Sequence, residues 1–278
     1  MTQLSSDICN VILFGASGAG KSSIVNMLAS GPVAEIGSGV QACTFESREY
    51  NVNVLGKAVT LWDTPGLDEG EEGRLPPADA ITQLYELLLS LTGGVSLLVL
   101  VMRAPRIKDS TSANWKLFRD IICQGEVPTA LVVTGLEEEE KMDQWWWKYK
   151  GDFQRYKIFP ADVACVTASR GKARRGGHVY DEEYDESREK IQKLILSTTL
   201  ADPFRVKPLV WFKKAVDTWV ETKWCGFVKK EMSREQTEEW NPLSEFLQVP
   251  GITKEFIDEL MKKMKTAEKA EGTFHSGR

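Results

Sequence analysis

Short, continuous apolar runs alternate with longer segments whose apolar positions follow helical spacing over about the first 200 residues. Runs of this kind are typical of buried strands, and the helical spacing is typical of helices that cover them. We expect strands at 8–14, as a pair within 45–62, and at 95–102, 128–134 and 162–167, with helices at 21–29, 79–91, 110–123, 138–156 and 183–197. The alternation predicts an α/β fold with a mostly parallel sheet that carries helices on both faces.

The alternation stops near residue 200, which predicts a domain of residues 1–200 followed by a C-terminal helical extension of residues 201–278. Apolar residues recur at helical intervals over 209–227, and a second amphipathic helix is expected after Pro250, with Thr253 as its cap. These helices need a surface to cover. They either dock on the first domain or contact a partner protein or a membrane surface. From about residue 266 the tail is expected to fray.

Composition adds a few limits to this picture. Of the 278 residues, 42% are hydrophobic and 27% are charged, which suits a folded chain with a substantial core. The net charge of −5 gives no broad attraction for nucleic acid. The five cysteines lack C-x-x-C spacing, so neither a disulfide framework nor a zinc site is indicated, and a cytoplasmic location suits them. The apolar run at 95–102 is too short to span a bilayer, so no transmembrane segment is expected.

The segment 15–22, with the sequence GASGAGKS, matches the phosphate-binding pattern G-x-x-x-x-G-K-[ST] at every fixed position. It lies between an expected strand and an expected helix, where glycines let backbone N–H groups surround phosphates and the helix dipole attracts a polyanion. We expect Lys21 to reach the β- and γ-phosphates and Ser22 to bind Mg²⁺. The nucleotide-contacting residues predicted here are Gly15, Ala16, Ser17, Gly18, Ala19, Gly20, Lys21, Ser22 and Ser23.

A second motif, D-T-P-G at 63–66, follows Lys21 by about 40 residues at the end of an apolar strand. An acid in this place can hold Mg²⁺ through water, which is the role expected of Asp63. The backbone N–H of Gly66 is expected to contact the γ-phosphate. Alone, D-T-P-G is a common turn, but together with the upstream loop it indicates a GTPase-like nucleotide site.

GTPases place a threonine between these two motifs, and its hydroxyl completes the Mg²⁺ shell when the γ-phosphate is present. Thr44 is our choice for this switch residue, with Ser38 as the alternative. Thr44 could also simply open the next strand, because β-branched residues favour strands. The predicted metal ligands are Ser22, Thr44 and Asp63, and the predicted catalytic residues are Lys21, Thr44 and Gly66.

Base recognition is predicted at segment 134–137, T-G-L-E, which follows the strand at 128–134. GTPases usually have N-K-x-D at this place, and Glu137 occupies the acid position. A carboxylate there accepts hydrogen bonds from guanine and faces a lone pair on adenine, so it would reject ATP. The alternative is that 137–140, four glutamates, form the acidic first turn of a helix. The base-contacting residues predicted are Thr134, Gly135 and Glu137, with Thr167, Ala168 and Ser169 from the T-A-S segment after the next strand.

The ordered set GASGAGKS, Thr44, DTPG, TGLE and TAS resembles the septin, chloroplast-import-receptor (Toc) and immunity-associated (GIMAP-like) branch of the TRAFAC P-loop GTPases. Within it, the LVVTGLE strand most closely resembles uncharacterised fungal G-domain proteins. The resemblance covers about residues 7–200 and implies a G domain that binds GTP or GDP with Mg²⁺. It also implies a homodimer across the nucleotide face and an arginine-containing box, for which 102–107 is the expected counterpart.

Hydrolysis is expected to be slow. Ras-type enzymes orient the attacking water with a glutamine directly after the switch glycine, and Leu67 holds that position here. Asp68, Glu69 or a group from a partner would have to activate the water. Two functions stay open: a slow GTPase switch that acts on an unknown effector protein, and a nucleotide-binding interaction module without appreciable turnover. A P-loop ATPase or kinase is less favoured because of the D-T-P-G motif.

Three further features have both a structural and a functional interpretation. The aromatic run 145–147 (WWW) is assigned to core and boundary packing rather than to a recognition surface. The basic segment 170–175 is expected to be a solvated loop rather than a contact to a phosphate or partner. Arg103 and Arg106 are expected to be solvated, although either could approach the phosphates of a partner subunit.

Overall fold

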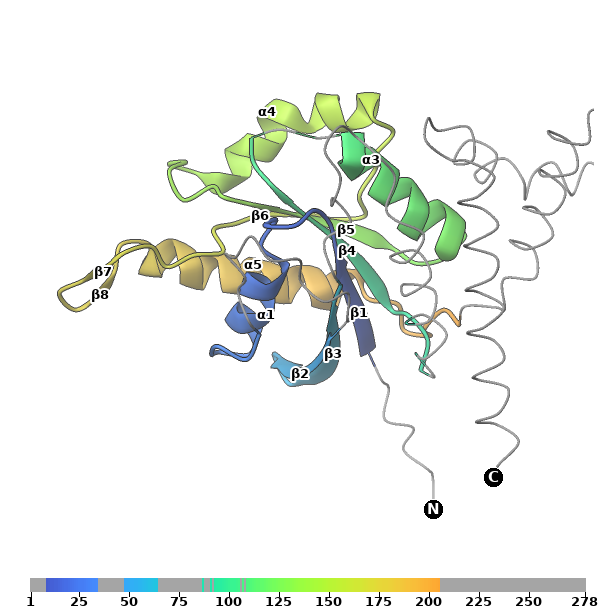
Figure 1. Ribbon diagram of the computed structural model, residues 1–278, viewed down its shortest axis with the longest axis horizontal. Helices are drawn as coiled ribbons and strands as arrows, with labels where there is room; N and C mark the ends of the chain where they lie inside the picture. Colours follow the sequence, from blue (N-terminus) through green and yellow to red (C-terminus); the bar gives the residue numbers. More distant parts are fainter. Residues whose placement is uncertain are drawn as a thin grey trace, which may run out of the picture.

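The computed structural model describes residues 9–34, 48–64, 93–105 and 109–205, together with Leu87, Leu91 and Ile107 (Figure 1). Several predictions from the sequence lie outside these residues. They are the helix at 79–91 apart from the two leucines, the residues Ser38, Thr44, Gly66, Leu67 and Arg106, and the C-terminal extension beyond residue 205.

A six-stranded sheet forms the centre of the described domain, in the strand order β2-β3-β1-β4-β5-β6. Only β2 runs antiparallel to its neighbour, and the other pairs are parallel, which confirms the predicted sheet. The strands are β1 (Cys9–Phe14), β2 (Arg48–Val54), β3 (Lys57–Asp63), β4 (Leu97–Arg103), β5 (Thr129–Thr134) and β6 (Val163–Cys165). Strands β1 and β5 are buried along their whole length, as expected for parallel strands covered on both faces.

Helices cover both faces of this sheet (Figure 1). They are α1 (Lys21–Leu28), α3 (Asp109–Trp115), the π-helical turn η1 (Lys116–Ile122), α4 (Met142–Arg155) and α5 (Asp181–Thr198). On one face α1 and α5 pack together, and Val25 and Leu194 join the inward residues of β1 and β4 in one apolar core. On the other face Phe14 stacks on Phe118, with ring centroids 4.0 Å apart. Apolar contacts on both faces therefore hold the sheet in place.

Among the described elements, the helix expected at 110–123 is divided into α3 and η1, and the start of α4 and the basic segment also differ from the sequence prediction. Helix α4 begins at Met142 rather than at residue 138, because a turn from Leu136 to Glu139 comes first and the cap residue Lys141 is extended. The basic segment is not an open loop. Its residues Ala173–Arg174 (β7) pair with Gly177–His178 (β8) in a small antiparallel hairpin, and Gly176, with a φ of +90°, permits the reversal.

After α5 the chain returns to the start of β4. Backbone hydrogen bonds of 2.7 and 2.8 Å join Val95 and Phe204 in both directions, and Leu200 N–H donates to the Ser96 carbonyl at 3.0 Å. This short bridge fixes the last described residues at the amino ends of the strands. Among the described residues, no helix has both the length and the apolar character that crossing a membrane requires.

Candidate nucleotide-binding site

The glycine-rich segment 15–22 connects β1 to α1 at the carboxyl end of the sheet. Gly15 has a φ of +140°, and Gly20, which precedes the helix as its cap residue, has a φ of +103°. A Cβ atom on Gly15 would lie 2.1 Å from the backbone oxygen of Val101 in β4. Only glycine allows the loop to approach the neighbouring strand this closely.

Lys21 is 7% exposed, and its ammonium group is held inside this loop. Its Nζ donates hydrogen bonds to the carbonyls of Gly15 and Ala16, at 2.9 and 3.0 Å. A buried ammonium group needs hydrogen-bond acceptors or an anion close by, and here the loop backbone supplies acceptors. The positive charge is therefore centred in the loop that the motif assigns to phosphates.

Ser22 and Asp63 bring the first two motifs into contact. The Ser22 hydroxyl donates to Oδ2 of Asp63 at 2.6 Å, since β3 lies beside β1 in the sheet. The other carboxylate oxygen, Oδ1, is buried and has no hydrogen-bond partner among the described residues. Burial raises the pKa of Asp63, while the Ser22 hydrogen bond and the charges of Lys21 and Arg48 act in the opposite direction.

Buried polar oxygens in folded proteins nearly always have a partner, so the second oxygen of Asp63 fits a ligand. Mg²⁺ prefers carboxylate, hydroxyl and phosphate oxygens, and Ser22 and Asp63 supply the first two types. The residues present therefore fit a magnesium ion. Thr44, the third ligand predicted from the sequence, lies outside the described residues.

Thr64 fixes the beginning of the D-T-P-G segment beside the glycine-rich loop. Its hydroxyl and its N–H both donate to the carbonyl of Leu13 in β1, at 2.8 and 3.2 Å. Thr64 itself is therefore fixed next to the loop. Gly66, to which the sequence assigns a contact with the γ-phosphate, is not among the described residues.

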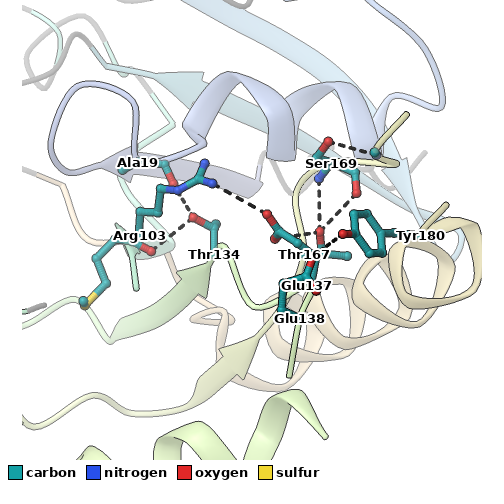
Figure 2. A network of polar contacts seen from close by, with 10 residues as sticks. Ala19, Arg103, Thr134, Glu137, Glu138, Thr167, Ser169 and Tyr180 are labelled. Atoms are coloured by element: carbon teal, nitrogen blue, oxygen red, sulfur yellow. Dashed lines mark hydrogen bonds and ion pairs between the residues drawn. The ribbon is translucent and has the colours of Figure 1, made fainter. Parts of the chain in front are cut away.

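The two predicted base-recognition segments also meet the glycine-rich loop. Thr134, at the end of β5, donates its hydroxyl to the Ala19 carbonyl at 2.7 Å (Figure 2). A Cβ atom on Gly20 would lie 3.2 Å from Cγ2 of Thr134 and 3.5 Å from Cβ of Ala168. Segments far apart in the sequence thus converge at one edge of the sheet, where ligands of parallel α/β sheets bind.

Glu137 lies in the loop before α4, so the alternative that it forms the acidic first turn of this helix is wrong. Its side chain is 19% exposed. Thr167 donates its hydroxyl to Oε2 of Glu137 at 3.3 Å, and Nη2 of Arg103 lies 3.6 Å from Oε1 (Figure 2). Because Arg103 is largely exposed, this ion pair contributes about 0–1 kcal/mol, so a ligand can replace it at small cost.

The T-A-S segment is itself held in shape by local hydrogen bonds. The Thr167 hydroxyl is 3.1 Å from the Ser169 carbonyl, and the Thr167 N–H donates to Ser187 in α5 at 3.0 Å. The Ser169 hydroxyl accepts from the N–H of Gly171 at 3.0 Å. These contacts place Thr167 beside Glu137 without any ligand contribution.

A second set of polar contacts joins this region to the β7–β8 hairpin. The acidic residues at 181–183 were expected to offset the basic segment, whereas the contact with Glu138 was not expected. The Tyr180 hydroxyl donates to the Glu138 carboxylate, and this hydrogen bond raises the pKa of Tyr180. Arg170, expected to be solvated, forms an ion pair with Asp181 and packs over the ring of Tyr184. The pairing of Arg103 with Glu137 was also missed. The two segments hold no signal for it, because it depends on β4 and β5 being neighbours in the sheet.

Comparison with known proteins agrees with this arrangement. Residues 10–134, a little under half of the chain, match the family described as 50S ribosome-binding GTPase. The fold is that of a P-loop GTPase G domain. The family match supports a guanine nucleotide as the ligand of this G domain. No curated protein matches the chain significantly.

Several solved structures are similar to the G domain at low sequence identity. Toc33 from Arabidopsis thaliana, in complex with GDP and Mg²⁺, is 17% identical, with 70% of this chain and 88% of that chain covered and a TM-score of 0.47. Era from Aquifex aeolicus, bound to GDP·AlF₄⁻, is 15% identical, with 76% of this chain and 67% of that chain covered and a TM-score of 0.45. Both TM-scores are below 0.5.

Proposed function

We propose that this chain binds GDP and GTP together with Mg²⁺ at the carboxyl edge of its sheet. The observation that carries the proposal is the Ser22–Asp63 hydrogen bond of 2.6 Å, beside a carboxylate oxygen that has no partner among the described residues. It joins two motifs that are 41 positions apart in the sequence. With Lys21 centred in the adjacent loop, the pair supplies a cation site next to a phosphate site.

Glu137 is the residue proposed to choose the base. Its carboxylate lies on the same edge as the glycine-rich loop and keeps part of its surface open. Guanine presents N–H donors that a carboxylate can accept, whereas adenine presents a lone pair at the corresponding ring position. The mismatch would leave Glu137 facing an acceptor, and an unmet polar group of this kind supports preference for guanine over adenine nucleotides.

We further propose that the chain acts as a switch with slow turnover. When bound, the γ-phosphate with Mg²⁺ would order the segments that contain Thr44 and Gly66, and hydrolysis would release them. Leu67 favours slow hydrolysis, because a leucine side chain cannot orient water. The same residue favours a second candidate, an interaction module that keeps its nucleotide. Phosphate release from GTP, measured over several hours with excess protein, distinguishes the two.

A nucleotide-dependent homodimer is part of the proposal, and its support is the resemblance of the motif set to the septin, Toc and GIMAP-like branch. The partner would approach across the nucleotide face. Gel filtration coupled to light scattering, with GDP and with a non-hydrolysable GTP analogue, tests this. We expect a dimer with the analogue, and a monomer in both states would contradict it.

The main test is a competition assay on the full-length chain. Fluorescent GDP is bound first, and GTP, GDP and ATP are added as competitors with and without Mg²⁺. We expect GTP and GDP to displace the probe and ATP to fail. Lys21→Ala is expected to abolish binding, and Glu137→Ala is expected to reduce the preference for guanine.

Glu140→Ala is the matched control for Glu137→Ala, because it removes an exposed carboxylate from the same acidic run. It is expected to bind like the natural chain. Preferential displacement by ATP, or unchanged base preference in Glu137→Ala, would contradict the assignment of guanine.

A further inference from the structure

The side chain of Arg103 lies over the segment that follows the neighbouring strand. It is the last residue of β4, and in the sheet it pairs with Thr134 at the end of β5. Its side chain lies across Gly135, where a Cβ atom would be 3.0 Å from Cγ and 3.2 Å from Nε of Arg103. Gly135 has no side chain of its own, so the arginine from the neighbouring strand takes the space above this backbone.

The guanidinium group lies on the outer side of Glu137. Arg103 is 63% exposed and Glu137 is 19% exposed, so the acid forms the inner part of the site and the arginine the outer part. Figure 2 shows the two side chains directed toward each other, with Thr167 on the other side of the carboxylate. Any ring whose edge donates hydrogen bonds to Glu137 must therefore lie next to Arg103.

A guanidinium group is flat, delocalised and weakly hydrated, and it stacks readily on aromatic faces. We infer that Arg103 stacks on the face of the purine ring whose edge Glu137 binds, and that it thereby sets the affinity for the base. The inference rests on the proposed function of this site. At 3.6 Å from Glu137, and with no short hydrogen bond to another described residue, the guanidinium can turn from the acid to the ring.

The test compares GDP with inosine diphosphate, which has the same ring system but lacks the exocyclic amino group. Dissociation constants are measured for the full-length chain and its variants by isothermal titration calorimetry with Mg²⁺. Arg103→Ala is expected to weaken binding of both nucleotides by the same factor, about 5- to 30-fold, because both present the same face for stacking. Arg103→Lys keeps the positive charge but lacks the planar guanidinium group, so it is expected to recover only part of the lost affinity.

Two controls separate stacking from other effects. Glu137→Ala is expected to reduce the preference for GDP over inosine diphosphate, because it removes the acceptor of the exocyclic amino group. Arg174→Ala removes an exposed arginine from the β7–β8 hairpin and is expected to leave both affinities unchanged. Thermal unfolding of each variant without nucleotide verifies that it is folded.

The outcomes are distinct. If the natural chain binds GDP and Arg103→Ala binds it equally well, the inference is overturned and the proposed function stands. If Arg103→Ala weakens the binding of GDP more than that of inosine diphosphate, as Glu137→Ala does, the arginine acts by orienting Glu137, and the stacking proposal is wrong. If the natural chain binds neither nucleotide, the proposed function fails and the inference fails with it.

Discussion

Gly15 illustrates how a single position connects the fold to the site. Its positive φ turns the chain out of β1, and its missing side chain lets the loop lie on the backbone of β4. Gly18, in the same loop, also has a positive φ but has open space around it. The two glycines therefore share the conformational requirement and differ in the steric one.

Gly15→Ala is expected to lower the free energy of unfolding by about 2–4 kcal/mol, because backbone strain adds to a clash with the Val101 carbonyl. Gly18→Ala has the strain without the clash and is expected to cost about 1 kcal/mol. Urea denaturation of both variants without nucleotide measures the difference. Equal destabilisation would contradict the close approach of Gly15 to β4.

Burial of Asp63 disfavours its ionised form, so the carboxylate is sensitive to pH and suited to a nearby cation. Because burial raises its pKa, the folded state holds the proton more strongly than the unfolded state. The ionised form therefore lowers stability at neutral pH. This penalty disappears as the pH falls through the raised pKa, and below about pH 3.9 both states are protonated.

Asp63→Asn is therefore expected to unfold at a higher denaturant concentration than the natural chain at pH 7 without nucleotide. The difference in unfolding midpoint between the variant and the natural chain should become smaller as the pH is lowered and disappear in acid. The same variant is expected to lose the magnesium dependence of nucleotide binding. Denaturation curves from pH 3 to pH 8 check the first part, and lower stability of the variant at pH 7 would show that nearby positive charges outweigh burial.

At the scale of elements, α4 shows why a run of three tryptophans cannot share one environment. Successive residues of a helix are about 100° apart around its axis, so one face cannot include all three. Trp145 is 3% exposed and contacts Phe153, as the assignment to core packing predicted. Trp147 is 66% exposed, and the assignment was wrong for this residue.

Trp145→Ala is expected to lower the free energy of unfolding by about 3–5 kcal/mol, because it removes a large side chain from the core. Trp147→Ala is the matched control on the same helix and should change stability by about 0.5 kcal/mol or less. Urea denaturation followed by circular dichroism measures both. A similar loss of unfolding free energy in the two variants would contradict the difference in burial between Trp145 and Trp147.

The elements that the sequence predicted well are those with a strong pattern. The strands β1, β4 and β5 are continuous apolar runs, and the structure places them in the centre of the sheet. The start of α4 and the β7–β8 hairpin were missed, because a backbone turn before a helix and a two-residue strand have no periodicity to detect.

Within the site, fixed motif spacing predicted which segments meet, and the contact of Ser22 with Asp63 follows from it. The pairing of Arg103 with Glu137 depends instead on which strands are neighbours. That order is a property of the whole sheet rather than of either segment. Thr44 and Gly66 stay predictions, since they lie outside the described residues.

At the scale of the whole molecule, the candidate site joins segments from β1, β3, β5 and β6 at one edge of the sheet. A ligand that contacts all of them adds its binding free energy to the stability of the folded state. The domain should therefore be markedly more stable with nucleotide than without it.

GDP with Mg²⁺, at 100 times its dissociation constant, is expected to stabilise the chain by about 2.7 kcal/mol and to raise Tm by about 5–10 °C. Chelation of the metal should remove a large part of the shift, because Ser22 and Asp63 then lose the ion they are proposed to share with the phosphates. Differential scanning fluorimetry measures this. ATP at the same concentration serves as the comparison, and an equal shift with ATP would argue against guanine selectivity.

The bridge between Val95 and Phe204 shows at which end of the sheet a label or tether would be attached. It anchors the outgoing chain at the opposite end of the strands from the glycine-rich loop, and β1 also begins there. A fluorescent protein or surface tether joined after Arg205 would thus start on the side remote from the nucleotide. The attached group would then begin away from the described residues of the candidate site.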